Sequence, residues 1–319
     1  MKDKIKFIIK SKRIYYFIFF TVLIYILLLF YADFSDILLA LRKINLKYMP
    51  LIILFTLIAH CMMFLRWRYL LKNLKINPPL KQNIQIYFSS WAMFFAPAKS
   101  GELVKCFFLK KIYQIPYKKS APVIFIEQIT DLIIILLFSF LGVSLFNIIS
   151  LDKIIPLFLF LFILIITFLL LLSYKKFVKK ITTLTKKISF IKKYVIEFEH
   201  MYSTANNLIK PKILVVSLLF SLGFWFFISQ ILYVLLKAFN IKLMALIPAS
   251  IFALSTLIGT LSFIPSGIGV MEASTLAILT SQGIDNSIAT ISLIIMRLFS
   301  LWFGAIIGIL TLWNLNKKL

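Results

Sequence analysis

Apolar segments long enough to cross a lipid bilayer recur along the whole chain, and they constrain its fold more than any other feature. A transmembrane helix needs about 20 predominantly apolar residues. Hydrophobic residues make up 61% of the 319 positions and the mean hydropathy is +0.99, so the chain is far more apolar than a soluble domain. The sequence therefore predicts one all-α polytopic membrane domain over residues 1–319. Its apolar segments are residues 14–32, 48–65, 84–96, 123–149, 154–173, 213–236, 243–264, 270–279 and 288–313.

Two short stretches that combine proline, glycine and glutamate interrupt these segments, one at residues 97–102 and one at 265–272. Proline removes a backbone donor and glycine loosens the chain. Lipid tolerates such breaks only where protein or a wet cavity surrounds them, and many transporters build substrate sites from broken helices. Two ordinary helix kinks are the alternative interpretation. The candidate substrate residues at the breaks are Pro97, Lys99, Gly101, Glu102, Pro265, Gly267, Gly269 and Glu272.

The distribution of lysine and arginine predicts a topology, because positive residues favour the cytoplasmic side. If segment 84–96 crossed the membrane fully, the lysines that follow it and the ten lysines of residues 174–212 would lie outside. If it dips in and returns, both groups stay inside. The same reasoning makes residues 243–279 a hairpin that enters from outside. With both hairpins, 29 of the 36 basic residues lie inside and 6 outside.

The predicted architecture therefore has about six full spans plus two oppositely oriented re-entrant helical hairpins, with both termini cytoplasmic. Because each hairpin carries Pro, Gly and Glu at its tip, a possible inverted repeat relates a first half, 1–173, to a second half, 213–319. Between them, residues 174–212 form a basic segment with apolar residues at helical spacing. This segment is expected to lie on an anionic inner leaflet, or to pack on the domain or on another chain.

Glu127 and Asp131 stand four residues apart in an apolar segment, so they share one helix face. A carboxylate at mid-bilayer costs roughly 2.5–3.5 kcal/mol on insertion scales, which predicts a functional role. The two side chains are expected to face a wet cavity or to pair with a cation, for which Arg297 is the most obvious partner. If the helix begins late, Glu127 lies only at the interface.

Glu102 and Glu272 each follow a break and are expected in the first turn of a returning half-helix. There a carboxylate either caps the positive helix end or contacts a lipid headgroup while Arg297 and free N–H groups hold a phosphate. Arg66, Trp67 and Arg68 combine basic and aromatic side chains after the second apolar segment. This combination predicts an interface anchor, or a first capture site for an anionic headgroup.

Several of these residues form an ordered set that resembles the transmembrane domain of the lysylphosphatidylglycerol synthase/flippase family. The matching pieces are RWRYLL at 66–71, PAKSGE at 97–102, EQITD at 127–131 and PSGIGVME at 265–272, followed by Gly283, Ala289 and Arg297. Relatives often carry arginine where this chain has Gln128. Bifunctional members also carry a soluble aminoacyl-transferase domain, which we do not expect here. The resemblance thus implies lipid translocation rather than lipid aminoacylation, in a prokaryotic plasma membrane.

The leading hypothesis is a flippase-like transporter that moves the headgroup of an anionic phospholipid or polyprenyl-linked lipid precursor. The partners expected are membrane lipids, with a possible homo-oligomer or partner synthase, and no nucleic acid, metal or cofactor. One alternative is an integral-membrane glycosyl- or aminoacyl-lipid transferase that uses its buried carboxylates as general bases, although no catalytic signature stands out. A non-transporting scaffold for a separate synthase is the other.

Cysteine labelling tests the predicted topology. Lys110→Cys and Lys186→Cys, in a chain whose Cys61 and Cys106 are replaced by serine, are expected to react only from the cytoplasmic side. The reason is that a re-entrant hairpin keeps both positive clusters there. Lys242→Cys is the control that should react from the opposite side. Labelling of positions 110 and 186 from different sides would contradict the architecture with two hairpins.

Overall fold

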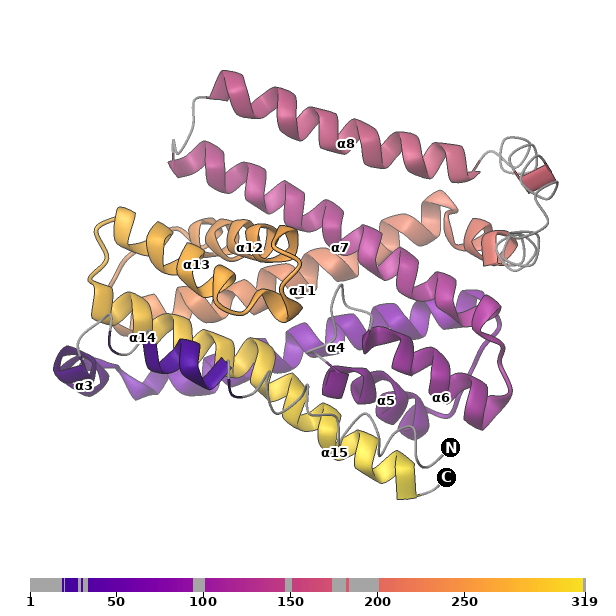
Figure 1. The fold of residues 1–319 in the computed structure, drawn as a ribbon, viewed down its shortest axis with the longest axis horizontal. Helices are drawn as coiled ribbons and strands as arrows, with labels where there is room; N and C mark the ends of the chain where they lie inside the picture. Colours follow the sequence, from indigo (N-terminus) through magenta and orange to yellow (C-terminus); the bar gives the residue numbers. More distant parts are fainter. Residues whose placement is uncertain are drawn as a thin grey trace.

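The computed structural model describes residues 19, 21–27, 30, 34–93, 101–146, 151–173, 182–183 and 201–317. Every regular element in these residues is a helix (Figure 1), which confirms the prediction of an all-α protein. Pro97 and Lys99 of the first break lie outside the described residues. So do much of the predicted first span, 14–32, and most of the predicted amphipathic segment, 174–212.

Four helical stretches of the described chain are long and apolar enough to cross a membrane. They are α4 (Met49–Asn73) with the 3-10 turn η1 (Leu46–Tyr48), α7 (Tyr117–Phe146), α11 (Pro211–Ala238), and the continuous run of α14 (Asn286–Arg297), the π-helical turn η5 (Leu298–Trp302) and α15 (Phe303–Lys317). A further apolar helix, α8 (Leu151–Ser173), follows α7, and the short α3 (Phe34–Lys43) precedes α4.

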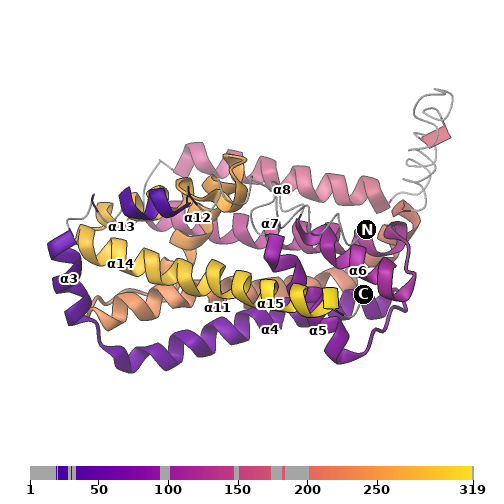
Figure 2. The ribbon, with the colours of Figure 1, turned by 60° about the horizontal axis from the view of Figure 1, so that its bottom comes forward.

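Two pairs of short helices lie between the long ones. The first pair is α5 (Leu80–Ser89), continued by the 3-10 turn η2 (Ser90–Met93), and α6 (Leu103–Tyr113). The second is α12 (Leu246–Leu261) and α13 (Val270–Ser281), joined through the 3-10 turn η4 (Pro265–Gly267). Figures 1 and 2 place α5 and α6 towards one end of the long helices and α12 and α13 towards the other.

The order of one long, two short and one long helix thus occurs twice, as α4 to α7 and as α11 to α15. Corresponding helices of the two halves also make corresponding packing contacts. The two leading long helices, α4 and α11, pack on each other. The closing long helix of each half packs on the first short helix of the other half, α7 on α12 and α15 on α5 with η2. Gly142 brings α7 close to α12, since a Cβ atom there would lie 2.9 Å from Ser250 Cβ. The contact pattern is therefore unchanged when the two halves are exchanged.

The contact between α15 and η2 depends on two glycines. A Cβ atom added at Gly304 would lie 2.4 Å from the Trp91 ring, and one added at Gly308 would lie 2.4 Å from the Ala92 backbone nitrogen. Small residues let membrane helices approach closely enough for backbone contact. These glycines therefore position the last long helix against the first short-helix pair.

The outer faces of the long helices are apolar. Leu54 and Leu57 of α4 are 49% and 50% exposed, and Phe160, Ile163 and Leu170 of α8 are 59–64% exposed. Soluble proteins rarely expose such continuous apolar surface, whereas lipid solvates it well. This surface and the four long apolar stretches indicate a multi-pass membrane protein. The number of full spans stays a prediction.

Adding one methyl group tests the packing of α15. Gly308→Ala is expected to lower the stability by about 1–3 kcal/mol, because the new Cβ meets backbone atoms that cannot move aside. The measurement is thermal unfolding of the purified protein in detergent. Gly223→Ala in α11 is the matched control, since its nearest contact is the flexible Met62 side chain at 3.4 Å. Equal effects of the two changes would contradict the proposed close contact.

Candidate functional site

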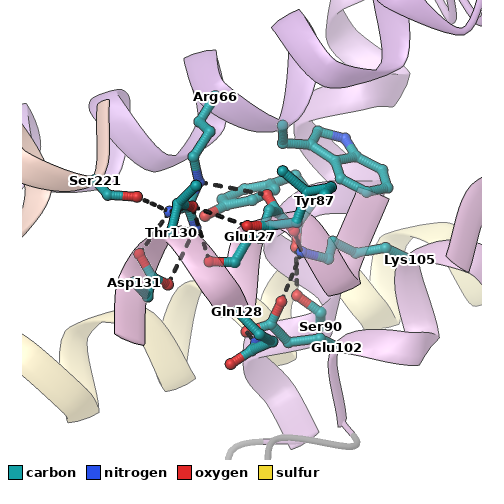
Figure 3. A network of polar contacts seen from close by, with 12 residues as sticks. Arg66, Tyr87, Ser90, Glu102, Lys105, Glu127, Gln128, Thr130, Asp131 and Ser221 are labelled. Atoms are coloured by element: carbon teal, nitrogen blue, oxygen red, sulfur yellow. Dashed lines mark hydrogen bonds and ion pairs between the residues drawn. The ribbon is translucent and has the colours of Figure 1, made fainter. Parts of the chain in front are cut away.

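A buried ion pair joins two of the long helices. Arg66 of α4 meets Asp131 of α7 side by side, with Nη1 2.5 Å from Oδ1 and Nη2 3.1 Å from Oδ2. Both residues are only 1% exposed. Helix α11 completes the site, because Ser221 accepts a hydrogen bond from Arg66 and Trp225 Nε1 donates one to Asp131 Oδ1 at 3.2 Å. The pair thus links α4, α7 and α11 at one point (Figure 3).

A second buried cation, Lys105 of α6, bridges two glutamates. Its Nζ lies 2.9 Å from Glu102 Oε2 and 2.7 Å from Glu127 Oε2. The same Nζ lies over the rings of Trp67 and Tyr87, 4.7 and 5.2 Å from their centroids. Carboxylates and aromatic faces both stabilise a cation that has lost its water. Lys105 therefore ties the start of α6 to the middle of α7.

We call Arg66, Glu102, Lys105, Glu127 and Asp131 the charged network. The two groups of the network touch, since Arg66 Nε lies 3.9 Å from Glu127 Oε1. Four members are almost fully buried, whereas the Glu102 side chain is 23% exposed. A buried ion pair contributes little net stability, but removal of one partner leaves an uncompensated charge and costs about 3–5 kcal/mol.

Local sequence explains part of the arrangement. Glu127 and Asp131 share a face of α7 through their spacing of four residues, as the sequence predicted. Glu102 and Lys105 stand three apart at the start of α6, so they also share a face. Gln128, next to Glu127 on α7, donates from Nε2 to Glu102 Oε1 at 3.0 Å. It thereby adds a hydrogen bond to Glu102 without adding charge.

A separate buried ion pair stands at the second break. Arg297 Nε lies 2.5 Å from Glu272 Oε1, and Arg297 Nη2 donates to the Ser266 carbonyl oxygen at 3.1 Å. Glu272 Oε2 accepts from the Gly269 backbone N–H at 2.7 Å, which caps the start of α13. Arg297 is followed directly by the π-helical turn Leu298–Trp302, and such turns are frequent at functional sites.

The glycines of the second break are needed for its backbone path. Gly267 and Gly269 have φ angles of +62° and +89°, where side chains with a Cβ atom are strained. A Cβ at Gly267 would also lie 3.0 Å from Gly259 Cα in α12. In the first break, a Cβ at Gly101 would lie 2.3 Å from the Met93 carbonyl oxygen. Glycine thus lets the returning chain lie against the descending chain in both breaks.

Two expectations about the arginines were wrong. Arg297 does not pair with Glu127 or Asp131, because helix packing places it against Glu272 while Arg66 binds Asp131. Arg66 and Trp67 do not lie at an exposed interface, where an anchor or a headgroup-capture site was expected, since they are 1% and 0% exposed. The apolar neighbours of Arg66 in α4 pack into the protein core, and Arg66 is buried because it lies on the same helix among them.

The structure brings Glu102, Glu127 and Asp131 into one network, and places Glu272 and Arg297 in a second, separate pair. Lys105 is the residue that sequence reasoning missed. The sequence signal that could have identified it is its position three residues after Glu102, which places the two side chains on one helix face. Among the described residues, no group of three or more His, Cys, Asp and Glu side chains is arranged to hold a metal ion.

Arg68, unlike its two predecessors in the chain, is exposed and lines a pocket of about 570 Å³. Basic, amide and apolar groups share this pocket, and Asn83 connects it to the charged network. Asn83 Oδ1 accepts a hydrogen bond from Trp67 Nε1 at 2.9 Å, and the Trp67 ring in turn faces Lys105. We call this the Arg68 pocket; it is lined by Leu65, Arg68, Tyr69, Lys72, Ile76, Asn77, Pro78, Asn83 and Phe220.

The chain is similar to a known protein family over nearly its whole length. Residues 18–308 match the family described as "Lysylphosphatidylglycerol synthase TM region". The chain belongs to this family. The match confirms the resemblance seen in the sequence, and it includes both breaks, the charged network and the Arg68 pocket.

Three archaeal proteins are similar to this chain, and each is described only as a UPF0104 membrane protein. The UPF0104 membrane protein MJ1078 of Methanocaldococcus jannaschii is 28% identical over 70% of this chain and 94% of its own length. MJ1595 of the same organism is 20% identical over 91% of each chain. A UPF0104 membrane protein of Methanothermobacter thermautotrophicus is 27% identical over 34% of this chain and 32% of its own length.

Two neighbouring arginines provide a test of the network. Arg66→Met is expected to lower the stability by about 3–5 kcal/mol, because Asp131 would remain buried without its cation. Adding Asp131→Asn should recover much of the loss. The measurement is thermal unfolding in detergent. Arg68→Met, two residues away but exposed, is the control and should change stability by less than about 0.5 kcal/mol. Equal losses for both arginines would contradict the assignment.

Proposed function

We propose that this protein is a flippase-like transporter that moves the headgroup of a membrane lipid from one leaflet to the other. The observation that carries the proposal is a charged network buried among lipid-facing helices and connected through Asn83 and Trp67 to an exposed basic pocket. Polar and ionisable side chains inside a membrane bundle commonly mark a substrate or ion pathway. Membership of the lysylphosphatidylglycerol synthase transmembrane family supports the same function.

The Arg68 pocket has the composition that an anionic lipid requires. Arg68 and Lys72 are exposed cations that can bind a phosphate, and the neighbouring Asn77 offers an amide for polar headgroup atoms. Leu65 and Phe220 line the same pocket and provide apolar contact for the beginning of an acyl or prenyl chain. The pocket therefore suits either an anionic phospholipid or a polyprenyl-phosphate lipid, held where the headgroup can approach the charged network.

Alternating access supplies the motion. In this proposal the two short-helix pairs are re-entrant hairpins that enter from opposite faces, within about six full spans related as an inverted repeat. The exchange symmetry of the packing and the location of the two pairs at opposite ends support it (Figures 1 and 2). The charge distribution favours cytoplasmic termini, and a plasma-membrane location is proposed because the family resemblance implies it.

Each hairpin is tied to the closing long helix of its own half by a cation. Lys105 ties Glu102 to Glu127 of α7, whereas Arg297 of α14 binds Glu272 directly. If the ion pairs of one hairpin broke while those of the other remained, only one hairpin at a time could move relative to its long helix. That is the requirement for a headgroup path that opens to one side and then to the other.

Reconstitution tests the proposed function. Liposomes that contain the protein should translocate labelled anionic phospholipid or polyprenyl-phosphate sugar faster than empty liposomes. Arg68→Glu combined with Lys72→Glu should slow this translocation by about tenfold or more, because a charge-assisted hydrogen bond worth about 1.5–3 kcal/mol becomes a repulsion. Lys242→Glu, an exposed basic residue outside the pocket, is the matched control and should leave the rate unchanged.

Absence of translocation for both lipid classes would contradict the proposal. Turnover of a nucleotide sugar or an aminoacyl-tRNA by the pure protein would instead support a membrane-bound transferase. If both assays fail while a synthase co-purifies with the protein and loses activity without it, a scaffold function would be favoured.

A further inference from the structure

A second polar cavity lies beside the turn that ends α4, at the same end of the long helices as the Arg68 pocket. Its volume is about 350 Å³, within the range of about 300–1,000 Å³ that is usual for ligand pockets. Three stretches far apart in the chain form it: the turn after α4, the start of α7, and the helical residues 201–208 that precede α11 (Figure 1). We call it the Lys75 pocket; its basic and hydrogen-bonding side chains include Lys75, Lys118, Lys119, Ser203, Thr204 and Asn207.

Three lysines gather around this cavity. Lys75 comes from the turn after α4, and Lys118 and Lys119 come from the first turn of α7. None of their ammonium groups makes an ion pair or a ring contact with another described residue. No carboxylate is among the described residues that line the cavity. Like charges around one cleft repel each other and focus a positive potential into it, and a bound anion relieves that repulsion.

The backbone fixes the position of Lys75. Its N–H donates to the Lys72 carbonyl oxygen at 3.0 Å, and the N–H of Ile76 donates to the Leu71 carbonyl oxygen at 3.0 Å. This helix-ending turn places Lys75 in the left-handed region, with φ of +58°, where glycine is usual and a Cβ atom is strained. Leu74 and Ile76 on either side of it are buried. The turn is therefore anchored in the core while its lysine lines the cavity.

Neutral hydrogen-bonding groups complete the lining. Ser203 and Asn207 stand four residues apart in a helical stretch, so they share one face, and Thr204 lies beside them. The stretch is anchored by Leu208, which is fully buried. Hydroxyl and amide groups can donate hydrogen bonds to phosphate oxygens, while ammonium groups neutralise the phosphate charge.

The lining distinguishes this cavity from the Arg68 pocket. There, Leu65 and Phe220 offer apolar contact to an acyl or prenyl chain. In the Lys75 pocket, the apolar side chains among the described lining residues are Leu74, which is 7% exposed, and Pro116. The cavity thus offers little surface to a lipid chain and suits a polar, negatively charged group.

We propose that the Lys75 pocket is a second anion site, which binds a phosphate group through Lys75, Lys118 and Lys119. The phosphate belongs either to a soluble phosphorylated compound or to the headgroup of an inner-leaflet lipid, because both present the same oxygens and the same charge. The site is separate from the lipid path of the proposed function, since no described residue lines both this cavity and the Arg68 pocket.

A phosphate bound here joins the two halves of the protein. The start of α7 belongs to the first half, whereas residues 201–208 lead into α11, the first long helix of the second half. A ligand that contacts both stretches stabilises the arrangement in which they lie together. In the proposed transporter the ligand is therefore a regulator that favours one conformation. That consequence rests on the proposed function, whereas the binding site does not.

Thermal unfolding of the purified full-length protein tests the site without a transport assay. In nanodiscs of phosphatidylcholine, pyrophosphate should raise the unfolding temperature more than chloride does at the same ionic strength, because it binds the folded state. A second set of nanodiscs contains phosphatidylglycerol and no pyrophosphate. A response to pyrophosphate assigns the site to a soluble ligand, and a response to phosphatidylglycerol assigns it to a lipid headgroup.

Three variants locate the response. Lys118→Gln combined with Lys119→Gln should remove the phosphatidylglycerol response, or raise the pyrophosphate concentration for half the shift by about tenfold, because two charge-assisted contacts are lost. Lys81→Gln combined with Lys212→Gln changes the net charge equally at exposed positions outside the pocket, and this matched control should respond as the wild type does. Lys75→Gly should weaken binding but keep or raise the unfolding temperature without ligand, because glycine relieves the left-handed backbone.

Absence of a response to either probe in the wild type would overturn the proposal. Equal losses in the two lysine pairs would overturn it too, because binding would then follow net charge alone. If Arg68→Glu with Lys72→Glu removes the response while the pair at 118 and 119 keeps it, the anion binds in the Arg68 pocket and the proposed site is wrong. If the response behaves as expected but liposomes show no lipid translocation, the phosphate site stands and the proposed function fails.

Discussion

Lipid cannot solvate a charge, and this constraint determines how the interior of the protein is built. Each ionised side chain that the long helices carry inward must find its counter-charge on another helix, so the ion pairs also specify which helices lie together. Arg66 on α4 is satisfied only where Asp131 of α7 and Ser221 of α11 meet it. The charged network, with Ser221 and Trp225 of α11, thereby links three long helices and the returning arm of the first short-helix pair.

The two halves share a packing plan but differ in chemistry. In each half a short-helix pair is broken by glycines, a glutamate begins the returning helix, and a cation connects that glutamate to the closing long helix. In the second half the pair of Glu272 and Arg297 is buried and is reinforced by the Gly269 N–H and the Ser266 carbonyl. In the first half, Lys105 is shared between two glutamates. Similar architecture thus carries a one-to-one ion pair in one half and a cation that bridges two glutamates in the other.

Local patterns predicted a good part of this protein. Hydropathy was sufficient for the all-α class and for the long apolar helices, because lipid admits few other structures. The spacing of four between Glu127 and Asp131 placed both on one helix face, and the motifs in their order led to the correct family. The roles of individual basic residues were less accessible. Arg66 and Arg68 are separated by one residue and look alike in the sequence, yet the first is buried and the second lines a pocket.

The sequence by itself determined where the chain is apolar, where its helices are interrupted, and which carboxylates share a face, since each of these depends on residues within one or two helical turns. Only the tertiary structure decided the partners. Lys105 meets Glu127 across 22 positions of the chain, Arg297 meets Glu272 across 25, and Arg66 meets Asp131 across 65. These choices follow from how glycine contacts and apolar faces seat the helices, and no local pattern of charges contains that information.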